Sequence, residues 1–318
     1  MHYAPELLPP PRYPADHKGR DVARTPAQEA QWRSLLAQAQ VLFDFDRASG
    51  RDLPTLAPRV EWIQAASAGI GEYIRAMGCA ESMPHTIVTT ASGVHAQPLA
   101  EFCFMVMFAC HKQLLHTLRE QRRKHWERFA GSDLHGQTLV IVGMGRVGTE
   151  VARMGQAFGM RVVGVKRSPA GVAAADLHVD VLYGPGELRR ALAEAHNLVL
   201  IAPHTADTDG MIGAAELALL PDGAVFNNIG RGALVDEPAL VAALQSGRLL
   251  GAGLDVFREE PLPPASPLWD MANVIVSPHS ASTSTRENVR ITELFCANLR
   301  LFLHGRPLMN RFDATRGF

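Results

Sequence analysis

The sequence lacks the features that mark secreted, membrane-spanning and metal-binding proteins. Its four cysteines form no CxxC pair and no metal-ligand spacing, which favours free thiols in a reducing, cytoplasmic setting; they are Cys79, Cys103, Cys110 and Cys296. The N-terminus has no basic start followed by an apolar core, so we expect no signal peptide. The longest apolar run, FCFMVMFAC, is far shorter than the ~20 residues that span a bilayer. No HExxH or similar cluster is present, and we assign no metal.

An excess of charge of one sign is also missing. The 318 residues carry a formal net charge of −1, which excludes a general electrostatic attraction to nucleic acids or anionic membranes. One basic run, REQRRKHW (Arg119–Trp126), is interpreted as a solvated helix end rather than a nucleic-acid-binding surface. The composition is typical of a globular protein, and the length predicts two domains.

Short apolar segments alternate with helical segments along most of the chain. After a proline-rich start, a helix is expected from Thr25, and the runs QVLFDF, VEWIQAASAG and IVTTASG are expected to be strands. A long helical stretch follows from Pro98, then the strands QTLVIVG, RVVGV, NLVLIAP, AVFNNI, GAGLDV and NVIVSPH, and a final helix from about Arg286 to His304. Such near-continuous apolar strands are typical of a parallel sheet covered on both faces. We predict an α/β protein in which residues 98–283 form a dinucleotide-binding domain, inserted into a smaller domain of residues 1–97 and 284–318.

The run GMGRVG has the GxGxxG spacing of a dinucleotide-binding loop. An apolar strand precedes it and a helix follows, as that loop requires. The first glycine permits a tight turn, the second allows a pyrophosphate to approach the backbone, and the third lets the helix pack on the strand. The helix N-terminus also attracts phosphate. We therefore expect cofactor contacts from Gly143, Met144, Gly145, Arg146, Val147 and Gly148.

The next strand ends in an unusual way. An NAD site has an acidic residue at this point, which binds the ribose hydroxyls. This chain has Lys166, Arg167 and Ser168 instead. Two cations and a hydroxyl suit the 2′-phosphate of NADP, although charged residues also occur at solvated strand ends. We predict NADP(H) as the favoured cofactor over NAD(H).

Three further polar residues follow successive apolar strands. Arg231 lies in a glycine-flanked turn, Glu260 comes five residues after Asp255, and His279 follows Pro278. Ligands of open α/β sheets bind at the carboxyl ends of the strands, so these three side chains are expected to converge there. An arginine, a carboxylate and an imidazole together can bind an acid and transfer a proton.

In order, spacing and residue type, these motifs resemble those of the D-isomer-specific 2-hydroxyacid dehydrogenases, which are NAD(P)-dependent enzymes. The resemblance runs from about Asp46 to Asn310 and is most specific between Gln137 and Ser282. It implies a Rossmann dinucleotide-binding domain inserted into a smaller flavodoxin-like α/β substrate domain. It also implies reduction of a small 2-oxo acid, such as glyoxylate or hydroxypyruvate, to the D-2-hydroxy acid.

The resemblance also implies residue roles. His279 would be the acid in reduction, Glu260 would stabilise its imidazolium, and Arg231 would bind the substrate carboxylate and polarise the carbonyl. The backbone amides of Ala68 and Gly69 would help to hold that carboxylate. Cofactor contacts are implied for Pro203, Thr208, Ile229 and Asp255, and for Asp255 a purely structural role stays open.

Other expectations stay open at this point. A cofactor-sensing, co-repressor-like binding protein and a phosphite- or formate-type oxidoreductase are alternative functions on the same fold. The presence of Glu260 without a Gln-His arrangement argues against the formate branch. The family habit implies a homodimer, with the helix from Pro98 and Trp126 at the interface. Either the run HYAPELL forms, in disguised form, the opening strand that family members usually have, or the chain begins late relative to the family.

Overall fold

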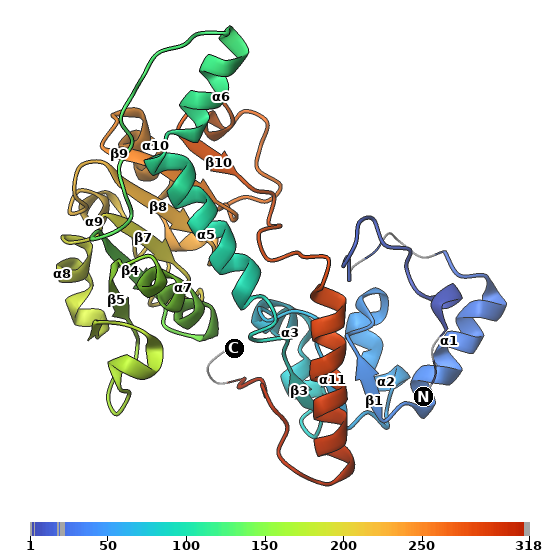
Figure 1. Ribbon diagram of the computed structural model, residues 1–318. Helices are drawn as coiled ribbons and strands as arrows, with labels where there is room; N and C mark the ends of the chain where they lie inside the picture. The colour runs from blue at the N-terminus through green and yellow to red at the C-terminus, as the bar shows by residue number, and fades with distance from the viewer. Residues whose placement is uncertain (1, 3, 18, 20–22, 315–318) are drawn as a thin grey trace. The chain divides into compact units, whose positions relative to one another are not determined.

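The computed structural model describes residue 2, residues 4–17, residue 19 and residues 23–314 (Figure 1). The chain divides into two compact units. The smaller unit contains Met1–His95 and Thr283–Phe318, and the larger unit contains Ala96–Ser282. No helix among the described residues is both long and apolar enough to cross a membrane.

A seven-stranded parallel sheet forms the centre of the larger unit, in the order β10-β9-β8-β7-β4-β5-β6. From β6 to β9 this is the strand order of the dinucleotide-binding Rossmann fold, with β10 added beyond β9. The strands are β4 (Thr138–Val142), β5 (Arg161–Val165), β6 (Val181–Tyr183), β7 (Asn197–Leu200), β8 (Ala224–Asn228), β9 (Leu249–Leu254) and β10 (Val274–Val276). The sequence predicted all of them except β6, which has only three residues, two of them partly exposed.

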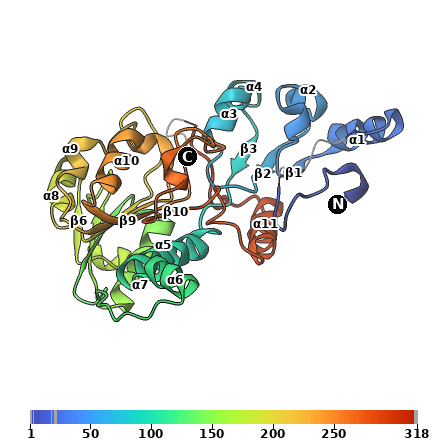
Figure 2. The same ribbon diagram turned by 90° about the horizontal axis from the view of Figure 1, so that it is seen from above.

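Helices cover both faces of this sheet because its strands are apolar on both faces. In β4, Leu139 and Ile141 pack on one side, whereas Val140 and Val142 pack on the other. Figure 2 shows α5 and α7 on one side of the sheet and α9 and α10 on the other. The helices are α5 (Ala96–His111), α6 (Leu114–Arg123), α7 (Arg146–Ala157), α8 (Leu188–Leu192), α9 (Ala214–Leu217) and α10 (Glu237–Gln245).

The helical stretch predicted from Pro98 is two helices rather than one. It begins at Ala96 and is interrupted at Gln113, whose φ of 51° is left-handed. The Gln113 side chain donates to the Ala130 carbonyl, which stabilises the break. Cys103 and Cys110, both on α5, are buried.

The smaller unit contains a three-stranded parallel sheet in the order β1-β2-β3, with β1 at Val41–Phe43, β2 at Trp62–Gln64 and β3 at Ile87–Thr89. Its helices are α1 (Pro26–Gln38), α2 (Leu53–Leu56), α3 (Gly71–Met77), α4 (Cys79–Ser82) and α11 (Glu287–Leu303). Thr25 caps α1 by accepting from the Gln28 amide, so this helix begins where the sequence predicted. Trp62 is completely buried and stacks on Phe295 of α11.

The opening of the chain contains no strand among its described residues. Pro5–Leu7 form a 3₁₀ helix, so the interpretation of HYAPELL as a disguised strand is wrong for this part, and Tyr3 lies outside the described residues. The consecutive prolines after Leu8 lack the amide donors that a sheet ladder requires. The other 3₁₀ helices are Arg47–Asp52, Ala174–Leu177, Pro185–Glu187, Gly232–Leu234 and Pro267–Trp269.

Candidate active site

The glycine-rich loop joins β4 to α7, and each of its glycines has a different environment. Gly143 has a φ of 113°, and a Cβ there would lie 2.6 Å from the Ala202 nitrogen. A Cβ on Gly148 would lie 2.3 Å from the Gly143 oxygen. A Cβ on Gly145 would meet no protein atom within 4 Å. Protein packing therefore requires the first and third glycines, whereas the second leaves open space at the N-terminus of α7, which fits an approaching pyrophosphate.

The end of β5 lies beside this loop. The Lys166 ammonium donates to the Met144 carbonyl at 2.8 Å, which ties the strand end to the loop. Arg167 and Ser168 are exposed, whereas Met144 is buried. The three residues predicted to bind a 2′-phosphate are thus next to the loop, but Lys166 also has a structural bond there.

The segment after β7 forms a tight turn that contains two of the predicted cofactor residues. The Thr208 hydroxyl donates to the Pro203 carbonyl at 2.8 Å and accepts from the Thr205 amide at 2.8 Å. Ile229, at the end of β8, is buried, and its amide donates to the Leu200 carbonyl at 3.1 Å. The bond from Ile229 joins the carboxyl ends of β7 and β8.

Arg231 follows β8 in a turn that Asn228 holds. The Asn228 side chain accepts from the Gly230 amide at 3.1 Å and donates to the Arg231 carbonyl at 3.0 Å. The guanidinium donates through Nη1 to the Gly230 carbonyl at 2.6 Å. Its side chain is partly exposed, so the guanidinium can also meet a ligand.

Glu260 and His279 form a pair. Glu260 Oε2 lies 2.8 Å from His279 Nδ1, and Glu260 Oε1 accepts from the Phe257 amide at 3.0 Å. Because an ionised carboxylate only accepts, Nδ1 carries the hydrogen and Nε2 remains for other chemistry. His279 has a φ of 54°, a left-handed conformation that is uncommon outside glycine and occurs often at functional sites.

Asp255 fixes the loop that carries His279. Its Oδ1 accepts from the Ser277 hydroxyl at 2.6 Å, the Ser280 amide at 2.8 Å and the Ala281 amide at 2.9 Å. Its backbone carbonyl accepts from the His279 amide at 3.0 Å. Burial raises the pKa of Asp255, although these hydrogen bonds oppose the shift. The structural role that the sequence left open for Asp255 is therefore present, whatever its contact with a cofactor.

Sequence reasoning missed the contact that joins the Arg231 and Glu260 loops. A Cβ on Gly232 would lie 1.9 Å from the Phe257 carbonyl carbon, so only glycine fits between the two backbones. The glycine flanking Arg231 was a usable signal for a close approach, but nothing in the sequence indicated Phe257 as the neighbour. Gly232 keeps the two loops in contact.

Ala68 and Gly69 belong to the smaller unit, in the turn that follows β2. Both are exposed, whereas Ala65 and Ala66 before them are buried. The Ala66 amide donates to Asp44 Oδ1 at 3.2 Å, which connects this turn to the end of β1. The two residues are therefore presented at the carboxyl edge of the small sheet, where α/β sheets bind ligands.

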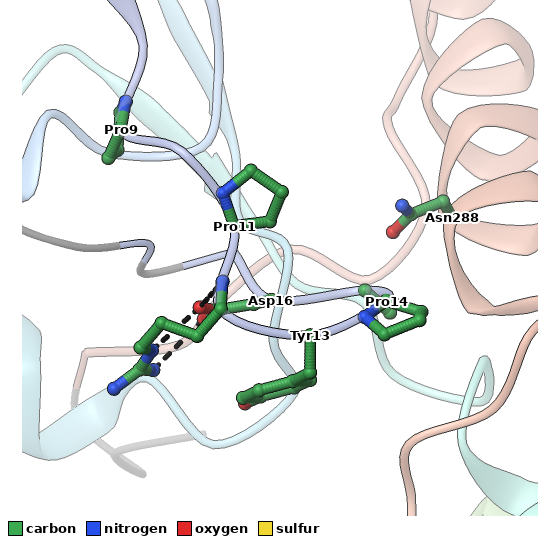
Figure 3. A pocket seen from close by; sticks show the side chains of 8 residues that line it. Pro9, Pro11, Tyr13, Pro14, Asp16 and Asn288 are labelled. Atoms are coloured by element: carbon green, nitrogen blue, oxygen red, sulfur yellow. Dashed lines mark hydrogen bonds and ion pairs between the residues drawn. The ribbon is translucent and has the colours of Figure 1, made fainter.

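A pocket elsewhere in the smaller unit contains none of these residues. It has a volume of about 480 Å³ and is lined by part of the N-terminal segment and by Asn288 (Figure 3). Arg12 and Asp16 pair across its wall at 2.7 Å. No group of metal-ligating side chains occurs among the described residues.

The family is shown by comparison with known proteins. Residues 104–281 match the family model described as D-isomer specific 2-hydroxyacid dehydrogenase, NAD binding domain. The chain belongs to the D-isomer-specific 2-hydroxyacid dehydrogenase family. It is 34% identical to the glyoxylate reductase of Aeropyrum pernix over 272 residues, covering 82% of this chain and 79% of the relative. It is 36% identical to the glyoxylate reductase of Korarchaeum cryptofilum over 227 residues, which are 69% of this chain and 66% of the relative.

Solved structures of the family have the same fold. The NADPH-dependent glyoxylate/hydroxypyruvate reductase of Sinorhizobium meliloti, in complex with NADP and sulfate, superposes with a TM-score of 0.78 at 27% identity, covering 92% of this chain and 90% of that one. A family member from Xanthobacter autotrophicus, in complex with NADPH and MES, gives 0.73 at 30% identity, with 84% and 82% covered. The predicted family and the predicted two-domain α/β fold are confirmed.

Proposed function

We propose that this protein reduces a small 2-oxo acid, such as glyoxylate or hydroxypyruvate, to the D-2-hydroxy acid and favours NADPH over NADH. The observation that carries the proposal is the Glu260–His279 pair at 2.8 Å, which belongs to the same set of strand-end loops as Arg231 and the glycine-rich loop. The names of the relatives above support 2-oxo acid reduction as the reaction. They give no support to a co-repressor-like or a phosphite- or formate-type function.

The residues of the larger unit suit proton transfer to a carbonyl oxygen. A bound NADPH supplies the hydride in this chemistry. His279 gives its Nε2 proton to the carbonyl oxygen and keeps its Nδ1 hydrogen, which it donates to the Glu260 carboxylate. The Glu260 carboxylate stabilises the imidazolium before transfer and fixes the ring orientation throughout. In the oxidation direction the same nitrogen accepts the proton.

Arg231 recognises the acid in this proposal. Its planar guanidinium can donate two parallel hydrogen bonds to a carboxylate and can also polarise the adjacent carbonyl. The backbone amides of Ala68 and Gly69 bind the same carboxylate, which is consistent with the exposure of both residues. Asp255 supports His279 and, as the family resemblance implies, contacts the nicotinamide carboxamide.

The cofactor preference rests on the end of β5. Arg167 and Ser168 are exposed beside the glycine-rich loop and bind the 2′-phosphate, while Lys166 adds positive charge and holds the loop carbonyl. Gly143–Gly148 cradle the pyrophosphate, and Pro203, Thr208 and Ile229 line the remainder of the cofactor. The absence of an acidic residue at this position supports NADP(H) over NAD(H).

A homodimer is part of the proposal, with the α5–α6 region at its interface. Trp126 is 93% exposed, and Leu114, Leu118 and Phe129 in the same region are also exposed. Large apolar side chains gathered in one region are typical of a protein interface.

Initial rates with NADPH and NADH, over a panel from glyoxylate and hydroxypyruvate to phenylpyruvate, test the function. We expect turnover of a small 2-oxo acid and at least about a tenfold preference for NADPH, equivalent to about 1.4 kcal/mol. Equal rates with both cofactors would reject the interpretation of Lys166–Ser168 as a binding site for the 2′-phosphate. No turnover with any 2-oxo acid would reject the enzymatic proposal.

A further inference from the structure

A buried carboxylate in the smaller unit holds two histidines that the proposed chemistry does not use. Glu287 is the first residue of α11, and its side chain is only 8% exposed. Its Oε1 lies 3.1 Å from His95 Nε2 and 3.3 Å from His17 Nε2. Burial opposes ionisation, but the hydrogen bonds from the two imidazoles lower the pKa of Glu287 to about 2. Since the ionised carboxylate only accepts, both Nε2 atoms carry a hydrogen and donate to the same oxygen.

His95 ends a segment that lies against the turn after β2. The Ala91 amide donates to the Ser67 carbonyl at 3.1 Å, and the Val94 amide donates to the Ala91 carbonyl at 3.1 Å. Ala66, Ala91 and Ile291 form one buried apolar cluster, against which Val94 packs. Residues 91–95 are therefore hydrogen-bonded to, and packed against, the turn that presents Ala68 and Gly69.

Residues 91–95 are held from both ends. Asn310 donates its side-chain amide to the Ser92 carbonyl at 2.8 Å, and its backbone carbonyl accepts from the Thr90 amide at 2.9 Å. At the other end, Glu287 bonds His95, and Ile291, one turn along α11, joins the apolar cluster. Helix α11 thus contacts residues 91–95 through one hydrogen bond to a carboxylate and one apolar contact.

We propose that Glu287 is a positioning residue for substrate binding: through His95 it fastens residues 91–95 against Ser67, and so fixes the turn whose Ala68 and Gly69 amides hold the substrate carboxylate. The inference rests on the proposed function for its effect on kinetics. A binding turn contributes most when its donors are already in place before the ligand arrives. Loss of the Glu287 charge loosens the turn and weakens capture of the acid, while the residues of the larger unit keep their contacts.

The two histidines provide an internal control because they hold different segments. His17 belongs to the N-terminal segment, which is also anchored by the buried Leu7 and by the Arg24 side chain, which donates to the Leu7 carbonyl at 3.0 Å. Loss of His17 removes one bond from Glu287 but leaves His95 and its segment in place. The kinetic effect should therefore follow His95 and not His17.

Steady-state kinetics of the full-length protein test the proposal. We expect Glu287→Gln and His95→Ala to raise the KM for the best 2-oxo acid about tenfold, with kcat and the KM for NADPH within about twofold of wild type. His95→Gln, which keeps a donor near the Nε2 position, should restore most of the loss. His17→Ala and Glu293→Gln, a change of an exposed residue on the same helix, should leave all three constants near wild type.

Hydrogen exchange followed by mass spectrometry separates this inference from the proposed function, because it needs no substrate. Amides of residues 66–69 and 91–95 should exchange faster in Glu287→Gln than in Glu293→Gln, even if the wild-type protein reduced no 2-oxo acid. Unchanged exchange in these segments would overturn the positioning role. An unchanged 2-oxo acid KM, or a parallel loss of kcat and NADPH affinity, would overturn it in an active enzyme.

Discussion

The two units hold their candidate binding groups in different ways. In the larger unit, each group is fixed by neighbours that are close in sequence or lie on the next strand end. Asn228 holds Arg231 three residues away, and Glu260 bonds His279 across 19 residues. In the smaller unit, the turn after β2 depends on distant parts of the chain, including Asn298, which donates to Gln64 across 234 residues, and Glu287, which bonds His95 across 192.

This difference bears on both the chemical step and the binding of the acid. The larger unit presents ionisable side chains, so changes there should act on the chemical step and, at Arg231, on binding of the acid as well. The smaller unit presents backbone amides on a braced turn, so changes there should act on binding of the acid. Variants in each unit test this division.

After the proton-transfer pair itself, the largest effect is expected for Arg231→Lys. The variant keeps the positive charge but loses the planar fork that can bind a carboxylate through two hydrogen bonds. Hydrogen bonds to charged groups contribute about 1.5–3 kcal/mol, so kcat/KM for oxo acids should fall roughly 10- to 150-fold. Steady-state kinetics with saturating NADPH measure this, and cofactor binding followed by nicotinamide fluorescence serves as the control. Wild-type kcat/KM in this variant would remove Arg231 from the site.

Gly232→Ala should affect activity and stability together. The added methyl would lie 1.9 Å from the Phe257 carbonyl carbon, so the Arg231 and Glu260 loops must separate. Overpacking of this kind costs about 1–3 kcal/mol, which urea unfolding can measure alongside kcat/KM. Gly186→Ala is the matched control, because a Cβ there would meet nothing within 4 Å. Equal stability of the two variants would show that the loops are not interlocked.

Arg167→Ala should reduce the preference for NADPH without affecting rates with NADH. Loss of one exposed cation near the 2′-phosphate should raise the NADPH KM by about tenfold, or about 1.4 kcal/mol. Arg153→Ala, which removes an exposed arginine from α7, controls for the change in net charge. An NADPH KM that moves equally in both variants would mean that Arg167 acts only through overall charge.

The smallest effect is expected at the amino edge of the large sheet, where His111 is buried. Its Nε2 lies 2.9 Å from Asn197 Oδ1 and its Nδ1 lies 2.8 Å from the Ser132 hydroxyl. Burial lowers the pKa of His111 below its ordinary value. As the pH is lowered, the unfolded chain therefore takes up a proton at a higher pH than the folded chain does. The contribution of His111 to the free energy of unfolding is fully present above about pH 6.5 and decreases below it, by at most about 1.4 kcal/mol per pH unit.

Urea unfolding at pH 7 and pH 5.5 checks this sign. His111→Gln keeps a donor toward Asn197 but cannot titrate, so its stability should change less between the two pH values than that of the wild type. His135→Gln, at an exposed position in the same unit, should keep the wild-type dependence. If His111→Gln lost stability with decreasing pH as steeply as the wild type, the acid sensitivity would come from other groups.

The same division explains how much the sequence could predict. Strand-end motifs such as GMGRVG and NVIVSPH are local, and the parallel sheet brings them together by topology, so the Rossmann domain and its candidate residues could be predicted. The Asn310 and Glu287 contacts could not, because they join segments whose proximity depends on how α11 packs. The break at Gln113 was also missed, since a left-handed glutamine has no strong sequence signal. The role of Lys166 as a bond to Met144 required side-chain positions.

The assignment of proton transfer to His279 is tested most directly by the rate of NADPH oxidation by the wild-type protein and by His279→Asn with a small 2-oxo acid at saturating cofactor. We expect the variant to bind NADPH as tightly as the wild type but to turn over about 10²- to 10⁴-fold more slowly, because no group remains to protonate the carbonyl oxygen. A variant that retains the wild-type rate would contradict the assignment of proton transfer to the Glu260–His279 pair.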